Sequence, residues 1–269
     1  MDNIIELNNI NYQLEGNCLF ENLNLQIEKG AFLSLIGKSG SGKTILLKIL
    51  TGLIQTNNKI KIDGLYLKEE NLLSIRSKIG IVFENPEVNI IADKVKDDIL
   101  YSIPKNKYSS SNLEKKISEI VQLLQIEELL EKNTSQLSGG EKQLVAIAGA
   151  LMKGAKILIL DNCFSMLDGV SKEKILKRLK KINREKKLTI IYVTSDIEDI
   201  LYGTHVALLG DKKIKFYGKN NQAFNQDGIF LEEGIEMPFM IQLSNKLKYY
   251  GLIDRNILDV GKMVNEIWK

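Results

Sequence analysis

Residues 37–44, Gly37-Lys38-Ser39-Gly40-Ser41-Gly42-Lys43-Thr44, match the pattern G-x-x-x-x-G-K-[ST] of a phosphate-binding loop. The apolar run Ala31–Ile36 predicts a buried strand directly before this loop, and Lys43–Leu53 predicts a helix directly after it. Backbone N–H groups of the glycine-rich turn and of the helix N-terminus can then surround phosphate oxygens. Lys43 would reach the β- and γ-phosphates, and Thr44 would bind Mg²⁺. The stretch therefore predicts a P-loop that holds nucleotide phosphates and Mg²⁺.

Short β-branched runs alternate with longer stretches of helical period along most of the chain. This alternation is typical of a parallel sheet flanked by helices, so the predicted fold class is α/β. Besides the strand before the P-loop, we expect core strands at Ile79–Phe83, Lys156–Leu160, Leu188–Val193, His205–Leu209 and Lys213–Tyr217.

Residues from about 86 to 150 have a different character. They contain few strand-like runs, a polar break at Ser109-Ser110-Ser111, and helical period across Leu113–Leu130. We therefore predict a mostly helical insert in this part of the chain, before a helix that runs to about Met152.

The C-terminal part is expected to form a small extension. Asn220–Gly228 has the composition of a polar connection, and helical period returns in Phe239–Tyr250 and Ile257–Trp268. Such a tail is too short for an independent core and should pack on the main body. We therefore expect a main domain over residues 1–228 and a helical extension over 229–269.

The composition indicates a globular protein with room for one large core, because 44% of the 269 residues are hydrophobic and 26% are charged. No apolar run approaches the ~20 residues of a membrane-spanning helix, and residues 1–9 do not resemble a secretory signal. We therefore expect a cytoplasmic chain. Cys18 and Cys163 are expected to be ordinary thiols. The net charge of +3 is mild, and Lys177, Lys180 and Lys181 fit a solvated helix face, so no nucleic acid partner is expected.

Two further motifs lie downstream of the P-loop. A P-loop ATPase needs an aspartate at the end of a neighbouring apolar strand to hold the Mg²⁺ shell, and Ile157-Leu158-Ile159-Leu160-Asp161 supplies one. Leu137-Ser138-Gly139-Gly140-Glu141-Lys142-Gln143 precedes a predicted helix and offers a second helix N-terminus to phosphate. Ser165-Met166-Leu167-Asp168 follows Asp161 almost directly.

In this order, the motifs resemble the Walker A, signature, Walker B and D-loop sequences of ABC transporter nucleotide-binding domains, over residues 1 to about 220. Within that superfamily, Ile81-Val82-Phe83-Glu84-Asn85-Pro86 and Met237-Pro238-Phe239-Met240-Ile241-Gln242-Leu243 resemble the ATPase subunits of energy-coupling factor (ECF) importers. Such importers take up vitamins or transition metals. The resemblance implies a P-loop, RecA-like parallel-sheet core with an N-terminal β-subdomain, the helical insert and the small C-terminal extension.

The resemblance also implies how the chain would assemble. Two ATPase subunits would form a head-to-tail dimer, with each ATP between Walker A of one subunit and the signature of the other. The residues that would then face a nucleotide bound by the partner are Ser138, Gly139, Gly140, Glu141 and Asp168. The dimer would be mounted on a transmembrane coupling protein, beside a membrane protein that captures the substrate, at the cytoplasmic face of the cell membrane. Whether the substrate is a vitamin or a metal stays open.

Three positions depart from the family's catalytic pattern. Asn162 replaces the glutamate that polarises the attacking water, Ser195 replaces the histidine that contacts the γ-phosphate, and Glu84 replaces a glutamine. The Asn162 amide cannot accept the water's proton, whereas Glu84 could bind Mg²⁺ but cannot donate a hydrogen bond when ionised. Losing a positioned base alone costs about 10²- to 10⁴-fold in rate. We therefore predict an ATPase subunit whose own site binds Mg-ATP and rarely cleaves it. The sole histidine, His205, is expected to be structural.

Two questions stay open at this point. The family's adenine-stacking position falls on Leu14, so the nearby Tyr12 either stacks on adenine or belongs to the core. The chain is either one half of an asymmetric transporter ATPase or a homodimeric nucleotide-binding regulatory module with two silent sites. A soluble ABC ATPase of translation or DNA repair is disfavoured, because such proteins carry tandem cassettes or long coiled-coil inserts.

Overall fold

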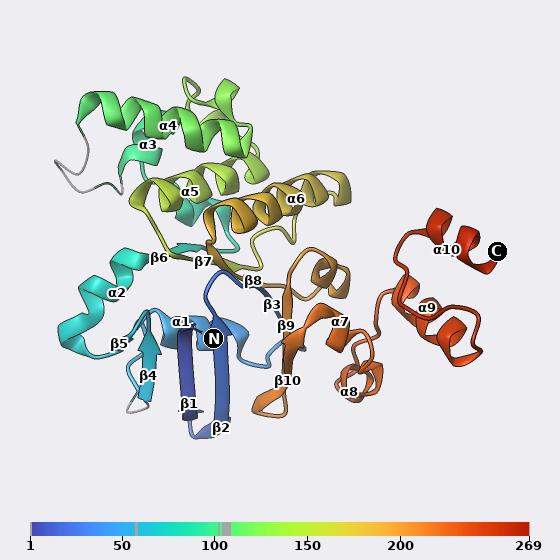
Figure 1. Ribbon diagram of the computed structural model, residues 1–269. Helices are drawn as coiled ribbons and strands as arrows, with labels where there is room; N and C mark the ends of the chain where they lie inside the picture. Colours follow the sequence, from blue (N-terminus) through green and yellow to red (C-terminus); the bar gives the residue numbers. More distant parts are fainter. Residues whose placement is uncertain (1, 57–58, 102, 104–108, 269) are drawn as a thin grey trace.

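The computed structural model describes residues 2–56, 59–101, 103 and 109–268. A parallel sheet lies at the centre, with strand order β10-β9-β3-β8-β7-β6 (Figure 1). Its strands are β3 (Phe32–Ile36), β6 (Ile79–Val82), β7 (Ile157–Asp161), β8 (Thr189–Val193), β9 (His205–Gly210) and β10 (Lys213–Lys219). All neighbours are parallel except β10, which pairs antiparallel with β9 at the edge. The α/β class is confirmed, and each predicted strand lies within two residues of its predicted bounds.

A second, antiparallel sheet has the order β2-β1-β4-β5. It consists of β1 (Asn3–Leu14), β2 (Asn17–Glu28), β4 (Lys59–Ile62) and β5 (Leu65–Tyr66). Its apolar side chains, such as Ile5 and Ile27, share one buried cluster with Leu33 and Leu35 of β3. The antiparallel sheet therefore packs on one face of the central sheet, together with the helix that follows the P-loop. This is the N-terminal β-subdomain that the family resemblance implies.

The helices and 3₁₀ turns of the body connect these strands. They are α1 (Lys43–Leu50), η1 (Glu69–Asn71), α2 (Leu72–Lys78), η2 (Pro86–Asn89), α3 (Val95–Tyr101), α4 (Ser110–Leu124), η3 (Glu127–Leu129), η4 (Thr134–Gln136), α5 (Gly139–Lys153), α6 (Gly169–Lys186) and η5 (Ile197–Leu201). Helices α3, α4, α5 and α6 bury their apolar side chains in one cluster with Phe32 and Tyr192, on the opposite face of the central sheet. Among the described residues, no helix has the length and apolar character to cross a membrane.

Two helix predictions were wrong at their C-terminal ends. Helix α1 stops at Leu50 rather than Leu53, because the chain turns at Gly52 with φ +66°. The Arg76 guanidinium donates hydrogen bonds to the carbonyls of Thr51 and Gly52, which hold the turn just after the helix. Helix α4 stops at Leu124, because Gln125 adopts φ +53°, and η3 continues the predicted stretch only as a short turn.

The predicted polar connection Asn220–Gly228 was also wrong, because two short helices occupy it. Helix α7 spans Asn220–Ala223 and α8 spans Asp227–Glu232. Ala223 and Phe230 are fully buried in one cluster with Ile36, Val206 and Leu208 of the central sheet. The few apolar side chains of this segment, spaced among polar residues, are therefore enough to attach it to the body.

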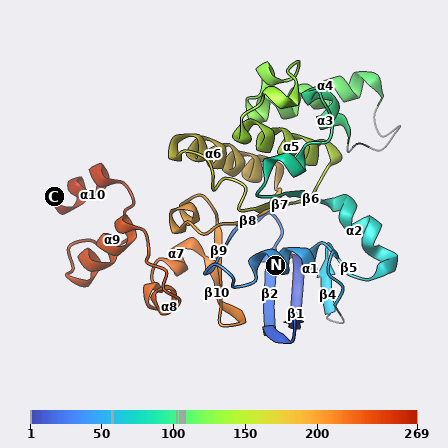
Figure 2. The ribbon, with the colours of Figure 1, turned by 180° about the vertical axis from the view of Figure 1, so that it is seen from behind.

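The C-terminal extension packs on the body only in part. Met237, just before α9 (Phe239–Tyr249), and Ile241 within it join the same cluster as Phe230. By contrast, Ile253, Ile257 and Met263 form a small separate cluster with side chains of α9, and they tie α10 (Val260–Ile267) to α9. Figures 1 and 2 show α9 and α10 to one side of the sheets in opposite views. The expectation that the whole tail lies on the main body was therefore wrong for α10.

Candidate nucleotide-binding site

The predicted site residues gather at the carboxyl ends of neighbouring parallel strands. The P-loop follows β3, Thr194 and Ser195 follow β8, Asp161 ends β7, and Glu84 lies just beyond β6. These four strands are consecutive in the sheet order, so residues far apart in the sequence share one edge. In an open α/β sheet, this edge is where ligands bind.

The P-loop is packed so tightly that two of its positions require glycine. A Cβ at Gly37 would lie 2.3 Å from the carbonyl oxygen of Leu209, and a Cβ at Gly42 would lie 2.8 Å from the ring of Phe20. Gly42 also has φ +98°, in the left-handed region. Within the loop, the Ser41 hydroxyl is buried without a hydrogen-bond partner among the described residues. An unsatisfied buried donor beside a helix N-terminus fits a loop that surrounds an anion.

Lys43 lies inside the loop rather than in solvent. Its ammonium donates hydrogen bonds to the backbone oxygens of Gly37 at 2.6 Å and Lys38 at 2.9 Å. Burial lowers the pKa of Lys43, and the charge of Asp161 opposes that shift. Phosphate oxygens entering the loop would offer this ammonium charged acceptors in place of the two carbonyls, which favours binding.

Thr44 and Asp161 form the candidate Mg²⁺ position. The Thr44 hydroxyl donates to Asp161 Oδ1 at 3.3 Å, and Asp161 is 6% exposed. Burial raises the pKa of Asp161, the Thr44 hydrogen bond opposes the shift, and the nearby charge of Glu84 adds to it. Hydroxyl and carboxylate oxygens are the donors that Mg²⁺ prefers, so the residues present fit this ion.

Two of the three departures from the family pattern contact each other. The Asn162 amide donates from Nδ2 to Glu84 Oε1 at 2.7 Å, and the Ser165 hydroxyl donates to the same oxygen at 3.3 Å. Asn162 directly follows β7 and has φ +50°, which turns its side chain away from the strand direction. Ser195, the third departure, is exposed just beyond the end of β8. The structure thus brings a carboxylate and an amide together beside Asp161.

The segment that contains Ser195 is held by a charged network that sequence reasoning missed. Lys172 of α6 contacts Asp196 at 2.7 Å and the buried Asp199 at 2.8 Å. The hydroxyls of Tyr192 and Thr194 donate to the other oxygen of Asp199. Residues 196–199 read Asp-Ile-Glu-Asp, so the sequence alone does not distinguish the buried Asp199 from its exposed acidic neighbours.

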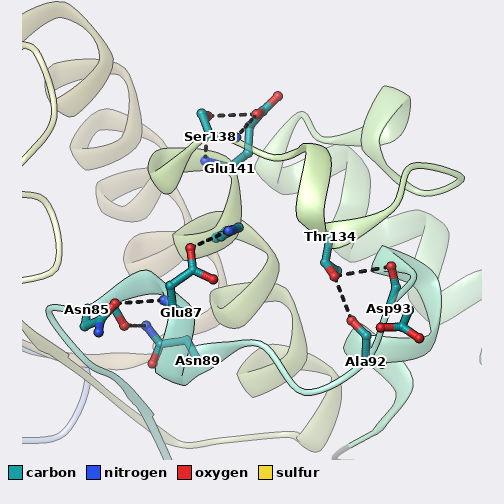
Figure 3. Close-up of polar contacts among 9 residues, drawn as sticks. Asn85, Glu87, Asn89, Ala92, Asp93, Thr134, Ser138 and Glu141 are labelled. Atoms are coloured by element: carbon teal, nitrogen blue, oxygen red, sulfur yellow. Dashed lines mark hydrogen bonds and ion pairs between the residues drawn. The ribbon is translucent and has the colours of Figure 1, made fainter.

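The signature motif forms the start of α5 and donates hydrogen bonds to the segment after β6. The Ser138 hydroxyl accepts from the Glu141 backbone N–H, while the Glu141 carboxylate accepts from the Ser138 backbone N–H, so the two form a capping box (Figure 3). The buried Gln143 amide donates to the carbonyls of Phe83 and Glu84, each at 3.1 Å. In the same view, Asn85, Glu87 and Asn89 lie below the helix start, where Glu87 pairs with Lys142.

The signature and the D-loop border a cavity of about 650 Å³. Its lining includes Gly139, Gly140, Leu167 and Asp168, and Asp168 caps α6 by accepting from the Ser171 backbone N–H at 3.0 Å. Hydrogen bonds from the Ser171 side chain, and then from its backbone N–H, lower the pKa of Asp168. Of the described residues, those of the P-loop do not line this cavity. The predicted site residues therefore fall into two groups. The Walker group consists of residues 37–44, Asp161, Asn162 and Ser195, and the signature group consists of residues 138–141 and Asp168. Glu84 contacts Asn162 and also lines the signature cavity, so it belongs to both surroundings.

Tyr12 and His205 have the contacts of packed residues. The Tyr12 ring is half-buried, lies 6.4 Å from the ring of Phe20, and packs on the cluster beneath the antiparallel sheet. Stacking of Tyr12 on adenine stays a prediction. His205 stacks on Tyr217 at 5.9 Å and shares a hydrogen bond with Thr204, and burial lowers the pKa of its imidazole. The structural interpretation of His205 agrees with these contacts.

Comparisons with known proteins identify the family. The model of the ABC transporter family matches residues 20–165. The energy-coupling factor transporter ATP-binding protein EcfA1 of Fusobacterium nucleatum is 35% identical over 99% of each chain. EcfA1 of Oenococcus oeni is 34% identical over 99% of this chain and 98% of its own. This chain belongs to the ECF-type ABC ATPases.

Solved structures of ABC ATPases share the fold. The protein cbiO1 of Clostridium perfringens, described as part of the ABC transporter complex cbiONQ, superposes with a TM-score of 0.79. It is 26% identical, and the match covers 91% of this chain and all of cbiO1. The dimeric bacterial ABC transporter cassette MJ0796 has a TM-score of 0.69 and 31% identity over 80% of this chain and 98% of its own. The P-loop α/β core predicted for an ECF-type ATPase is thereby confirmed.

Proposed function

We propose that this ECF-type ATPase binds Mg-ATP at its own Walker group and rarely cleaves it, while its signature group completes the ATP site of a second ATPase subunit. The observation that carries the proposal is the division of the site. The signature and D-loop line a cavity together with Glu84, and none of residues 37–44 is among its lining. This arrangement supports a signature that acts on a nucleotide presented by another chain.

The Walker group retains the residues that bind and has changed those that would cleave. Backbone N–H groups of the P-loop and Lys43 would hold the phosphates, and Thr44 with Asp161 would hold Mg²⁺, which supplies charge neutralisation when bound. The Asn162 amide cannot take a proton from water, and the Ser195 hydroxyl is a weaker base and a shorter side chain than the family's histidine. Binding without efficient cleavage follows from this combination.

The signature group is intact and oriented by its own capping box. Ser138 and Gly139 stand at the N-terminus of α5, whose dipole favours negative charge. In a head-to-tail dimer, this end of the helix would face the γ-phosphate held by the partner and stabilise the charge that develops during cleavage. The dimeric cassette MJ0796, to which this chain is similar, gives a precedent for paired cassettes.

The membrane partners are proposed from the relatives' names and from one surface. ECF ATP-binding proteins are named as parts of transporters, and cbiO1 is described as part of a complex. The proposed partners are a transmembrane coupling protein and a substrate-capture protein, with this chain at the cytoplasmic face of the membrane. The segment from Glu84 to Val88 lies between the sheet and the helical block, and the exposed side chains of Val88 and Ile91 offer the coupling protein an apolar contact.

Mg-ATP binding with slow turnover is the expected behaviour of the purified chain. A fluorescent ATP analogue should bind in the presence of Mg²⁺, and Lys43→Ala should weaken that binding because it removes the cation that holds the phosphates. Steady-state phosphate release should stay far below that of an ABC homodimer with the unaltered catalytic pattern. Fast turnover by the chain alone that Lys43→Ala abolishes would contradict the proposal. Mass spectrometry of the assembled complex would show whether a second, different ATPase subunit is present or whether the homodimeric alternative holds.

A further inference from the structure

The side chains of Glu84 and Asn162 contact each other. The family's catalytic glutamate is absent at position 162, but Glu84 supplies a carboxylate next to that position. We propose that Glu84 accepts the proton of the attacking water in the slow hydrolysis that this Walker group retains, and that Asn162 orients that water. This assignment rests on the proposed function, because it requires Mg-ATP to bind at the P-loop of this chain.

The geometry places a carboxylate within one hydrogen bond of the residue that follows Asp161. Asn162 Nδ2 donates to Glu84 Oε1 at 2.7 Å, and the Ser165 hydroxyl donates to the same oxygen at 3.3 Å. Among the described residues, the hydrogen bonds to this carboxylate end on Oε1, so Oε2 is the oxygen that can meet a water. Because Nδ2 of Asn162 donates to Glu84, the Oδ1 atom of Asn162 can accept a hydrogen bond from the same water.

The backbone of Glu84 is held in place from the buried side. Gln143, which is 1% exposed, donates from Nε2 to the carbonyls of both Phe83 and Glu84. Asn89 in turn donates to the Phe83 carbonyl at 2.9 Å and to Gln143 Oε1 at 2.9 Å. A general base must be positioned before its basicity matters, and these contacts supply that positioning.

The Glu84 carboxylate lies close enough to Asp161 for the two charges to interact. The charge of Glu84 reaches Asp161 strongly enough to contribute to the raised pKa of that carboxyl, after burial as the main cause. Glu84 is exposed in the isolated chain, so solvent water reaches its carboxylate.

The proposed step conserves atoms and charge. A water oxygen forms a bond to the γ-phosphorus, and the bond from that phosphorus to the bridging oxygen of the β-phosphate breaks. The electron pair of that bond leaves with ADP, and one proton of the water passes to the Glu84 carboxylate. Inorganic phosphate departs, and the proton on Glu84 is then released to solvent.

A double-mutant cycle tests the assignment. Full-length wild type, Glu84→Gln, Asn162→Glu and the double variant are compared in single-turnover hydrolysis of γ-labelled Mg-ATP, with binding measured for each. Glu84→Gln should slow the residual hydrolysis by at least about 10²-fold, because the proposed base is removed. Asn162→Glu alone should bring little gain, since it places two carboxylates against each other. The double variant should recover at least the wild-type rate, because it exchanges the two groups. Glu70→Gln, at an exposed carboxylate far from this edge of the sheet, is the matched control.

Rescue in the double variant separates a base from a merely structural residue. A structural role of Glu84 would not recover when the carboxylate is placed at position 162 instead. Normal Mg-ATP binding combined with a wild-type rate in Glu84→Gln would overturn this assignment alone. Equal slowing of the two single variants with no recovery in the double variant would overturn it as well. Absence of Mg-ATP binding by the wild type would overturn the proposed function and this assignment together.

Discussion

Gly139→Asp is expected to abolish the ATPase activity of the assembled complex, although the chain that carries it still binds its own ATP. Gly139 is the first residue of α5, and the dipole of that helix would face the partner's γ-phosphate. A carboxylate there would replace attraction by repulsion, and loss of one such stabilising contact costs about 10²- to 10³-fold in turnover. The nearest atom to a Cβ at this position is Pro86 Cγ at 3.4 Å, an ordinary contact, so the effect arises from charge rather than misfolding. Gly139→Ala is the uncharged control and should be far milder.

Lys43→Ala is expected to reduce the ATPase activity of the complex less than Gly139→Asp does. Lys43→Ala weakens only the site that already carries Asn162 and Ser195, so its main expected effect is weaker closure of the dimer. The measurement is ATPase activity of the reconstituted complex with each substitution introduced separately. If Lys43→Ala is as damaging as Gly139→Asp, either both sites hydrolyse or closure needs ATP in both. Equal loss, with no measurable ATP at this chain's own site in the wild-type complex, would defeat the binding-only role.

Lys172→Met is expected to lower the free energy of unfolding by about 3 to 5 kcal/mol, because it leaves a buried carboxylate without its cation. Asp199 is 2% exposed and lies 2.8 Å from the Lys172 ammonium. Burial lowers the pKa of Lys172, but its hydrogen bonds to Asp196 and Asp199 outweigh burial, so that pKa is raised overall. Chemical denaturation measures the loss. Lys177→Met, at an exposed lysine that pairs with Glu173, should change stability by less than about 1 kcal/mol.

The destabilisation by Lys172→Met should grow with pH. Burial already raises the pKa of Asp199, and Lys172 opposes that rise. Without Lys172, native Asp199 would hold its proton to a higher pH than the unfolded chain does, so stability falls as the pH rises through that interval. The loss should therefore be smaller near pH 5 than near pH 8, and Asp199→Asn in the Lys172→Met background should remove most of this dependence. A loss of stability that is the same at both pH values would show that the charge pair is not its cause.

The nucleotide-binding core could be predicted from sequence because its signals are local. The P-loop needs glycine at Gly37 and Gly42, where a Cβ would strike Leu209 and Phe20, and a glycine pattern reports that need directly. Likewise, β7 and β8 are buried along their whole length, and a strand buried on both faces appears as a continuous apolar run. The capping box of Ser138 and Glu141 joins residues three apart, so the start of α5 was equally visible.

Element ends were harder to predict because distant residues decide them. Leu53 continues the apolar period of α1, but the helix ends at Leu50. Just beyond that end, Arg76 binds the carbonyls of Thr51 and Gly52 across 25 and 24 residues of sequence. The segment from 220 to 228 is mostly polar, but it contains α7 and the start of α8, because Ala223 and Phe230 of these two helices pack in one cluster with the central sheet. In both cases, packing with a remote partner overrode the local pattern.

By itself, the sequence determined the α/β class, the P-loop, Asp161, the signature and the three replaced residues, since each depends on neighbours along the chain. Only the tertiary structure decided that two of the replaced residues touch. Glu84 and Asn162 are 78 residues apart, and they meet because β6 and β7 lie side by side in parallel. The same holds for Lys172 and Asp199, which belong to different elements. A parallel sheet places the ends of non-consecutive segments at one edge, so the chemistry there depends on strand order and side-chain direction, which no local pattern of residues records.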